Sequence, residues 1–275
     1  MNPALKALQL KARHQVYTLL NGQNLSKLHG EGYDFSELRE YQVGDDIRKI
    51  NWMITAKLGK PYIKELHANR ELSVVVAALM DASLYFGAGN AKQKKLTEVA
   101  TLLGYASQNN NDLFTGVSYT EKETHSTPPT KQLYHIEQFS NTLYETPLLG
   151  TTLDFNASIQ DLFKRLHKPS LVFVLGDFLE EVDLSLLAQK HEVIAIIIRD
   201  KAEESPKKLG EVTLASPQND SKMETYFGKK SIEKYLARLK ENDERLVEHF
   251  SSHDIRYVKI FTGDEVLGNL ISLFL

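Results

Sequence analysis

The run Val74-Val75-Val76-Ala77-Ala78-Leu79-Met80 decides the fold class of this 275-residue chain. Its residues are apolar without polar alternation, which is typical of a strand that is buried on both faces of a sheet. Similar runs occupy residues 171–175 and 193–198, and residues 113–119 and 255–261 also have the pattern of strands. The sequence therefore predicts at least five strands.

Segments with helical spacing separate these strands. Apolar residues recur three or four positions apart at 96–106, 153–166, 184–188 and 266–274, which is the period of one helix face. Residues 212–227 resemble a hairpin, and a long helix is expected at 231–250. Strands that alternate with helices predict an α/β fold, with a doubly wound, mostly parallel sheet flanked by helices.

The chain before residue 71 has a different character. Residues 5–20 have the spacing of an amphipathic helix, and residues 25–70 are polar, Gly-containing and without clear periodicity. We therefore expect two parts: residues 1–70, a helix and an irregular segment packed on the core, and residues 71–275, the α/β domain.

Composition excludes several classes of protein. Lys and Arg number 33 against 36 Asp and Glu, which gives a net charge of −3, so no nucleic-acid partner is expected. The chain has no Cys, which rules out thiol catalysis and thiolate metal sites. Neither a signal peptide nor an apolar run of about 18 residues is present, so we expect a cytoplasmic protein without an integral membrane segment.

Polar residues follow two of the predicted strands. Asp81 and Ser83 come after the first apolar run, Asp177 follows the run at 171–175, and Thr152 lies where we expect the preceding helix to open. The carboxyl ends of parallel strands form the binding edge of an open sheet, so these side chains should converge there. Carboxylate and hydroxyl oxygens suit Mg²⁺. The alternative is that the two Asp residues cap the following helices and the hydroxyls bond to loop backbone.

This arrangement resembles the metal-ion-dependent adhesion site of von Willebrand factor A domains, in which an Asp-x-Ser loop, a Gly-x-Thr and a strand-terminal Asp recur. The resemblance implies that an ion, Mg²⁺ or Mn²⁺, is held directly or through water, and that a partner's Glu or Asp completes its coordination. The residues that match are Asp81, Ser83, Thr152 and Asp177.

One position departs from that pattern. Tyr85 stands where the family has its second Ser, and a bulky phenol is a poor replacement for a small hydroxyl. The sequence is therefore compatible with a site that binds the ion and with one that has lost it.

The most distinctive stretch lies between residues 29 and 52. It contains Arg-x-Tyr-x-x-Gly-Asp-Asp-x-Arg followed by Ile-Asn-Trp, and it resembles the signature of the domain-of-unknown-function 58 (DUF58) family. The resemblance implies a von Willebrand A-like module encoded beside a MoxR-type AAA+ ATPase, acting with it or its protein client in the maturation or assembly of other proteins. The signature residues are Arg39, Tyr41, Gly44, Asp45, Asp46, Arg48 and Trp52.

These signature residues have two interpretations. Carboxylate–guanidinium pairs can brace the segment against the sheet, with Trp52 as an apolar anchor. Alternatively, the same side chains contact the partner directly. The sequence does not choose between a structural and a partner-binding role.

A phosphatase is the alternative from another class. An Asp after the first strand and the pair Gly176-Asp177 also resemble haloacid-dehalogenase-like phosphatases, in which Mg²⁺ and a nucleophilic Asp transfer a phosphoryl group. Those enzymes need an acid two residues after the nucleophile, and that position holds Ser83. We therefore expect a non-enzymatic interaction module and keep the Mg-dependent phosphatase as the alternative.

A short basic cluster begins the helix expected at 96–106. Lys92, Lys94 and Lys95 lie within four residues, and such runs are usually solvated. The sequence therefore predicts that all three lysines lie on an exposed face.

Overall fold

The computed structural model describes residues 2–22, 33–42, 45–68, 72–86, 90–219 and 221–272, in two compact units. The larger unit comprises residues 1–16 and 72–275, and the smaller comprises residues 17–71. The first helix, α1 (Pro3–Gly22), thus begins in the larger unit. There the Gln9 side chain donates to Asn141, and Lys11 pairs with Glu98. These contacts explain why the division differs from the expected one at residues 70 and 71.

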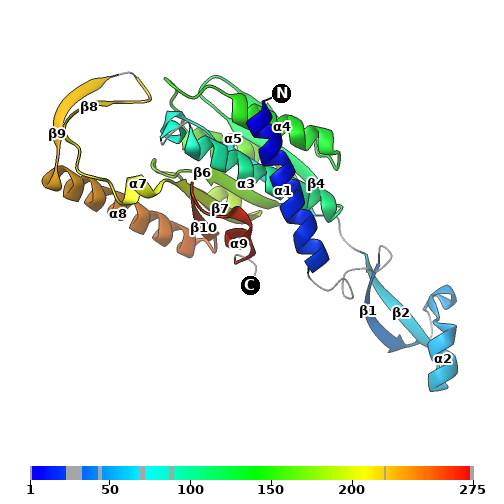
Figure 1. Ribbon diagram of the computed structural model, residues 1–275. Coiled ribbons are helices and arrows are strands. Elements are labelled where there is room, and N and C mark those ends of the chain that lie inside the picture. The colour runs from blue at the N-terminus through cyan, green and yellow to red at the C-terminus, as the bar shows by residue number, and fades with distance from the viewer. Residues whose placement is uncertain are drawn as a thin grey trace. The chain divides into compact units, whose positions relative to one another are not determined.

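A six-stranded sheet with the order β10-β7-β6-β3-β4-β5 forms the centre of the larger unit (Figure 1). Five strands are parallel, and only the edge strand β5 is antiparallel. The bounds are β3 (Ser73–Leu79), β4 (Leu113–Tyr119), β5 (Thr124–Ser126), β6 (Leu171–Gly176), β7 (Glu192–Arg199) and β10 (Arg256–Phe261). The five predicted strands are present, and the predicted α/β class with a mostly parallel sheet is confirmed.

Helices cover both faces of this sheet (Figure 1). On one face, α5 (Phe155–Arg165), α6 (Ser185–Ala188) and α8 (Lys229–Ser252) close an apolar core with alternate residues of the central strands. The other face carries α3 (Ala91–Asn109), α4 (Leu133–Glu145) and α9 (Val266–Ile271), with α1 beside α3 and α4. None of the helices in the described ranges combines the length and apolar character that crossing a bilayer requires.

The strand order places a topological switch point between β3 and β6. From β3 the chain goes to β4 on one side and then returns to β6 on the other side. Strands β3 and β6 are paired in register from Val74↔Leu171 to Ala78↔Leu175, so both end at the same edge. In open α/β sheets, ligands and partners bind outside the carboxyl ends of strands at such a point.

A hairpin of β8 (Gly210–Ala215) and β9 (Lys222–Phe227) follows the short helix α7 (Lys201–Glu204), as the sequence predicts. Most of its residues are exposed. Its tip reaches the loop before α5, where the Gly150 N–H donates to the Pro217 carbonyl at 2.8 Å. Gly150 has φ +77°, a conformation that costs glycine little. The hairpin therefore ends beside the loop that carries Thr152.

The smaller unit contains regular secondary structure, whereas an irregular segment was expected. Strands β1 (Tyr33–Glu40) and β2 (Tyr62–Ala68) pair antiparallel, and the 3₁₀ helix η2 (Ile47–Lys49) and α2 (Trp52–Leu58) lie between them in sequence. The Asn51 side chain caps α2 by accepting from the Ile54 N–H, and Gly59 ends the helix with φ +74°. None of the α2 residues is buried. The helix therefore has no buried apolar face, and its sequence has no apolar periodicity from which a helix could be predicted.

Candidate functional site

Ser83 lies between the two carboxylates that end β3 and β6. Asp81 begins the 3₁₀ helix η3 (Ala82–Tyr85) and accepts from the Ser83 N–H at 3.0 Å. The Ser83 hydroxyl contacts the carboxylates of both Asp81 and Asp177. Because a hydroxyl carries one proton, it donates to one carboxylate and accepts from the other only when that one is protonated. Burial raises the pKa of Asp81, and the Asp177 charge raises it further, so Asp81 is the carboxyl that keeps a proton more readily.

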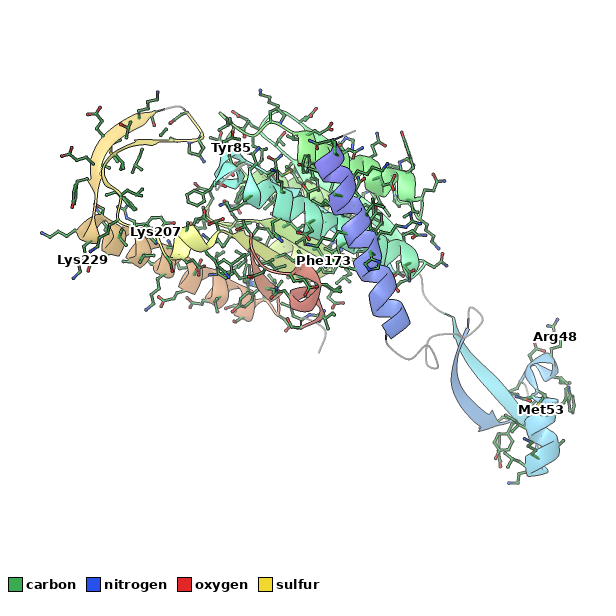
Figure 2. The ribbon with its side chains drawn as sticks, viewed as in Figure 1. Arg48, Met53, Tyr85, Phe173, Lys207 and Lys229 are labelled. Carbon is green, nitrogen blue, oxygen red and sulfur yellow. The ribbon has the colours of Figure 1, made fainter. Side chains whose placement is uncertain are left out.

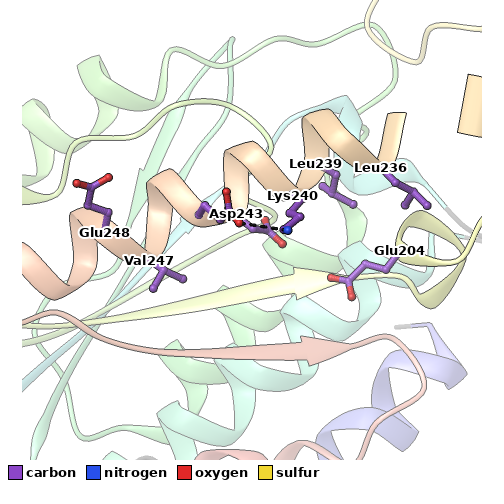
Figure 3. Close-up of a pocket in the computed structure, with 8 residues that line it drawn as sticks. Glu204, Leu236, Leu239, Lys240, Asp243, Val247 and Glu248 are labelled. Atoms are coloured by element: carbon purple, nitrogen blue, oxygen red, sulfur yellow. Dashed lines mark ion pairs between the residues drawn. The ribbon is translucent and has the colours of Figure 1, made fainter. Parts of the chain in front are cut away.

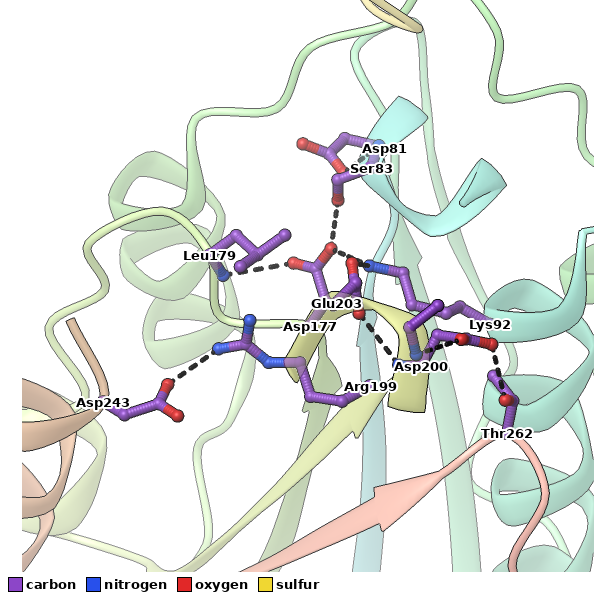
Figure 4. A network of polar contacts seen from close by, with 11 residues as sticks. Asp81, Ser83, Lys92, Asp177, Leu179, Arg199, Asp200, Glu203, Asp243 and Thr262 are labelled. Atoms are coloured by element: carbon purple, nitrogen blue, oxygen red, sulfur yellow. Dashed lines mark hydrogen bonds and ion pairs between the residues drawn. The ribbon is translucent and has the colours of Figure 1, made fainter. Parts of the chain in front are cut away.

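Lys92 supplies a positive charge to this edge (Figure 4). It lies in the first turn of α3 and is fully buried. Its ammonium lies 2.9 Å from Asp177 Oδ2 and 2.7 Å from Glu203 Oε1. Burial raises the pKa of Asp177, but Lys92 and the Ser83 hydroxyl outweigh burial and hold the pKa below its ordinary value. Asp177 therefore remains an anion.

The backbone after Asp177 takes an uncommon conformation. Phe178 has φ +52° and is fully buried, a conformation that costs an L-residue on the order of 1 kcal/mol. Two contacts hold the turn: the Asn242 side chain donates to the Phe178 carbonyl at 2.9 Å, and the Leu179 N–H donates to Asp177 Oδ1 at 3.2 Å. This turn fixes the direction of the Asp177 carboxylate.

Further charges connect the edge to α8. Arg199, at the end of β7, is fully buried and donates to Asp243 Oδ1 at 2.9 Å. Lys259 then pairs with Asp243 at 2.7 Å and with Glu204 at 2.6 Å. Charges of alternating sign thus join the end of β7 to α8, and Figure 4 shows the Arg199–Asp243 pair among them.

Of the four predicted ion ligands, the hydrogen bonds join three and leave Thr152 apart. Thr152 is exposed, and its N–H donates to Glu121 Oε2 at 3.2 Å. The helix that Thr152 was expected to open begins later, at Phe155, with Asp154 as its N-cap. The backbone of Thr151, rather than a threonine hydroxyl, meets the first loop, because its carbonyl accepts from the Ala82 N–H at 3.3 Å.

The capping alternative is present for Asp81 but not for Asp177, which no helix directly follows. The Asp81 side chain caps η3, and Asp177 accepts from the backbone two residues later. Both carboxylates therefore have a local structural role in addition to meeting at Ser83.

The prediction that the lysine cluster is solvated is wrong for two of its three members. Lys92 and Lys95 are buried, and only Lys94 is exposed. Lys95 pairs with Glu98 at 2.7 Å. The spacing contained a signal, since Lys92 precedes Leu96 by four residues and Val99 by seven, which places it on the apolar face of the helix.

The donors as folded do not fit a divalent ion. Asp81, Ser83 and Asp177 are the side chains that would hold Mg²⁺ or Mn²⁺, but both Asp177 oxygens already accept hydrogen bonds or an ion pair. Within the described ranges, no group of three or more His, Cys, Asp or Glu side chains is placed to hold a metal ion. Tyr85, in the place of the second Ser, is 38% exposed. Binding of Mg²⁺ or Mn²⁺ remains a prediction from the sequence.

In the smaller unit, one predicted carboxylate–guanidinium pair is formed. Arg48 contacts both oxygens of Asp46, at 3.1 and 3.2 Å, while Asp45 accepts from the Gln42 N–H at 2.8 Å. The pair is largely exposed. Trp52 is 66% exposed, so it does not anchor the interior of this unit.

Two other signature residues make backbone contacts, and a third lies outside the described residues. The Tyr41 N–H donates to the Pro61 carbonyl at 2.8 Å, and Arg39 is opposite Ile63 in the β1–β2 pairing. Gly44 lies outside the described residues. The Asn51 N–H, next to Trp52, also donates to the Tyr62 carbonyl at 2.8 Å, so both ends of the signature lie beside β2.

A groove of about 650 Å³ lies along α8 (Figure 3). Its apolar lining comes from Leu236, Leu239 and Val247, and four acidic side chains and Lys240 surround these residues. Asp243 belongs both to this groove and to the chain of charges. The groove is therefore connected to the sheet edge through ion pairs.

A family model described as "Protein of unknown function DUF58" matches residues 37–245. The chain belongs to the DUF58 family. The resemblance of the signature is thereby confirmed. The DUF58 chain is 25% identical over 223 residues to the uncharacterized protein Rv1480 of Mycobacterium tuberculosis (strain ATCC 25618 / H37Rv), covering 78% of this chain and 70% of the relative. The uncharacterized protein Mb1516 of Mycobacterium bovis matches with the same values.

Solved structures with some similarity to the DUF58 chain include the conserved hypothetical protein BatB from Bacteroides thetaiotaomicron and the SpRpn10 VWA domain. The first has 7% identity and a TM-score of 0.43, and the match covers 74% of this chain and 97% of that one. The second has 9% identity and a TM-score of 0.40, with 73% and 94% covered. The fold class itself follows from the strand order and pairing described above.

Proposed function

We propose that this DUF58 chain is a cytoplasmic protein-interaction module that presents the carboxyl edge of its sheet to a MoxR-type AAA+ ATPase or to the protein client of that ATPase. The observation that supports this proposal is a set of exposed apolar side chains at the edge: Tyr85, Phe86 and Leu149 are 38%, 44% and 55% exposed. Tyr85 is labelled in Figure 2. We call these three residues the apolar rim.

The rim lies on two loops that are bonded to each other. Tyr85 ends η3 and Phe86 follows it, and the loop of Leu149 accepts from η3 through the Thr151 carbonyl. Below these loops, the buried pairs of Lys92 hold the strand ends in place. Exposed aromatic side chains on a rigid support are typical of residues that dominate the binding energy of protein interfaces.

The finer prediction from the sequence is that Mg²⁺ or Mn²⁺ bridges this edge to an acidic residue of the partner. The proposed use of the apolar rim does not require such a bridge. No observation favours the phosphatase alternative, because the position that should hold its acid is Ser83, whose hydroxyl contacts both carboxylates.

The proposal is tested by binding to the purified MoxR-type ATPase from the same organism, measured by calorimetry. We expect wild type to bind and the variant Tyr85→Ser, Phe86→Ser to bind at least about tenfold more weakly, the effect of losing about 1.4 kcal/mol. Tyr134→Ser is the matched control, since Tyr134 is 66% exposed on α4. Equal loss in the control, or no binding by wild type to the ATPase or to a complex of it with its client, would contradict the proposal.

A further inference from the structure

We propose that Lys92 takes the place of a divalent ion at the carboxyl edge, so that its ammonium is a built-in cation and the edge requires no metal. The inference concerns the chemistry of the edge and does not rest on the proposed function.

Lys92 is directed to the edge by the start of α3. The helix begins after Asn90, which has φ +60°, a left-handed conformation that Asn tolerates better than most residues. Lys92 is in the first turn of the helix and is fully buried, on the same face as Leu96. A lysine is almost never fully buried unless it is paired, and here the pairing is with two carboxylates.

The two carboxylates come from elements far apart in sequence. Asp177 ends β6 and Glu203 lies in α7, and the Lys92 ammonium is within 2.9 Å of both. Both carboxylates are almost completely buried. The ammonium therefore joins α3, β6 and α7 at the switch point, as a cation shared between loops would do.

This arrangement and a bound divalent ion exclude each other. An ion bound by Asp177 would stand next to the ammonium that already occupies Asp177 Oδ2, and like charges at this distance repel strongly in a buried site. Mg²⁺ also requires near-octahedral oxygen ligands at about 2.1 Å. With the ammonium on Oδ2, the Ser83 hydroxyl and the Leu179 N–H take the remaining positions around this carboxylate, so its oxygens are not available in that geometry while Lys92 is present.

Hydrogen bonds within and around α7 fix the Glu203 carboxylate beside Lys92. Its other oxygen, Oε2, accepts from the Asp200 N–H at 2.8 Å, as part of a capping box that begins α7. The Asp200 side chain in turn accepts from the Thr262 hydroxyl at 2.7 Å. The position of the Glu203 carboxylate is therefore set by the capping box as well as by its ion pair with Lys92.

The experiment compares thermal midpoints in chelator and in excess Mg²⁺ or Mn²⁺ for wild type, Lys92→Met and the control Lys94→Met, which removes an exposed lysine from the same helix. We expect wild type and Lys94→Met to shift by less than about 1 °C. We expect Lys92→Met to melt lower in chelator and to recover by several degrees with Mn²⁺, because the vacated carboxylates then bind the ion. Binding of Mn²⁺ is followed in parallel by electron paramagnetic resonance.

Two outcomes overturn the proposal. The first is a metal-dependent rise of several degrees in wild type that Asp81→Ala abolishes, or stoichiometric Mn²⁺ on wild type by resonance. The second is a folded Lys92→Met protein that neither loses stability nor responds to metal. If Lys92→Met does not fold with or without Mn²⁺, the wild-type titration and resonance decide, since the proposal requires that wild type binds no ion.

Discussion

The sheet edge and the signature segment both contain Asp residues paired with basic residues, but they hold them in different surroundings. At the edge, the side chains of Lys92 and Asp177 are 0% and 1% exposed. In the smaller unit, those of Arg48 and Asp46 are 91% and 39% exposed. Arg48 even has the better geometry, because it contacts both carboxylate oxygens.

This difference shows that burial, rather than residue type or geometry, determines how much the loss of one partner of an ion pair changes the free energy of unfolding. Breaking a buried pair leaves a charge without compensation and costs about 3–5 kcal/mol. An exposed pair contributes about 0–1 kcal/mol, because water solvates both partners well. We therefore expect substitutions of the same kind to change the stability by different amounts in the two regions.

The largest effect is expected for Lys92→Met measured in chelator. The substitution leaves Asp177 and Glu203 buried without their cation, so the free energy of unfolding should fall by about 3–5 kcal/mol. Urea denaturation followed by far-ultraviolet circular dichroism measures it, with Lys94→Met as the control. A fall below about 1 kcal/mol would mean that this pair behaves like a surface pair.

An intermediate effect is expected for Glu98→Gln. Burial raises the pKa of Glu98, but the hydrogen bonds from Lys11 and Lys95 outweigh it, so the pKa lies below the ordinary value of 4.5. A lowered carboxyl pKa gives stability that is complete above 4.5 and is lost as the pH falls through the folded-state value. Glu98→Gln should therefore cost about 2 kcal/mol at pH 7 and progressively less below pH 4.5.

The measurement for Glu98 is the free energy of unfolding as a function of pH for the variant and wild type. The difference between the two curves should narrow on the acid side only. A difference that stays constant from neutral to acid pH would show that the loss comes from packing rather than from the charge of Glu98.

The smallest effect is expected for Arg48→Met. Because the Arg48–Asp46 pair is exposed, the stability of the smaller unit should change by less than about 1 kcal/mol. The chain has a single Trp, and Trp52 lies in α2 of this unit, so its fluorescence reports on the unit alone. A loss as large as that of Lys92→Met would mean that the signature segment braces the molecule through this pair.

Periodicity could be read where residues are buried in a regular pattern. The runs beginning at Val74 and Leu171 predicted strands because both faces of those strands are covered. The same reasoning failed for residues 25–70, since α2 has no buried residue and a helix without an apolar face leaves no periodic signal. Helix α4 was also missed, although Ile136, Phe139 and Leu143 are buried at helical spacing, as was β5, whose three residues are too few to show a period.

The candidate site was predictable only to the extent that it depends on strand ends. Asp81 and Asp177 follow directly from parallel strands. Thr152 was placed by analogy with a motif, and its loop turns at Gly150 so that the Thr151 backbone meets η3 instead. The positive φ of Phe178, which directs Asp177, depends on the burial of its ring and on Asn242 from a distant helix.

The sequence by itself determined the α/β class, the five parallel strands and the meeting of two carboxylates at one edge, because unbroken apolar runs of this length are stable only inside a covered sheet. Only the tertiary structure decided which cation meets those carboxylates. Asp177 and Glu203 follow Lys92 by 85 and 111 residues, and the three meet because β3, β6 and β7 are neighbours in the sheet. A contact of that kind depends on strand order, which local spacing along a chain does not encode.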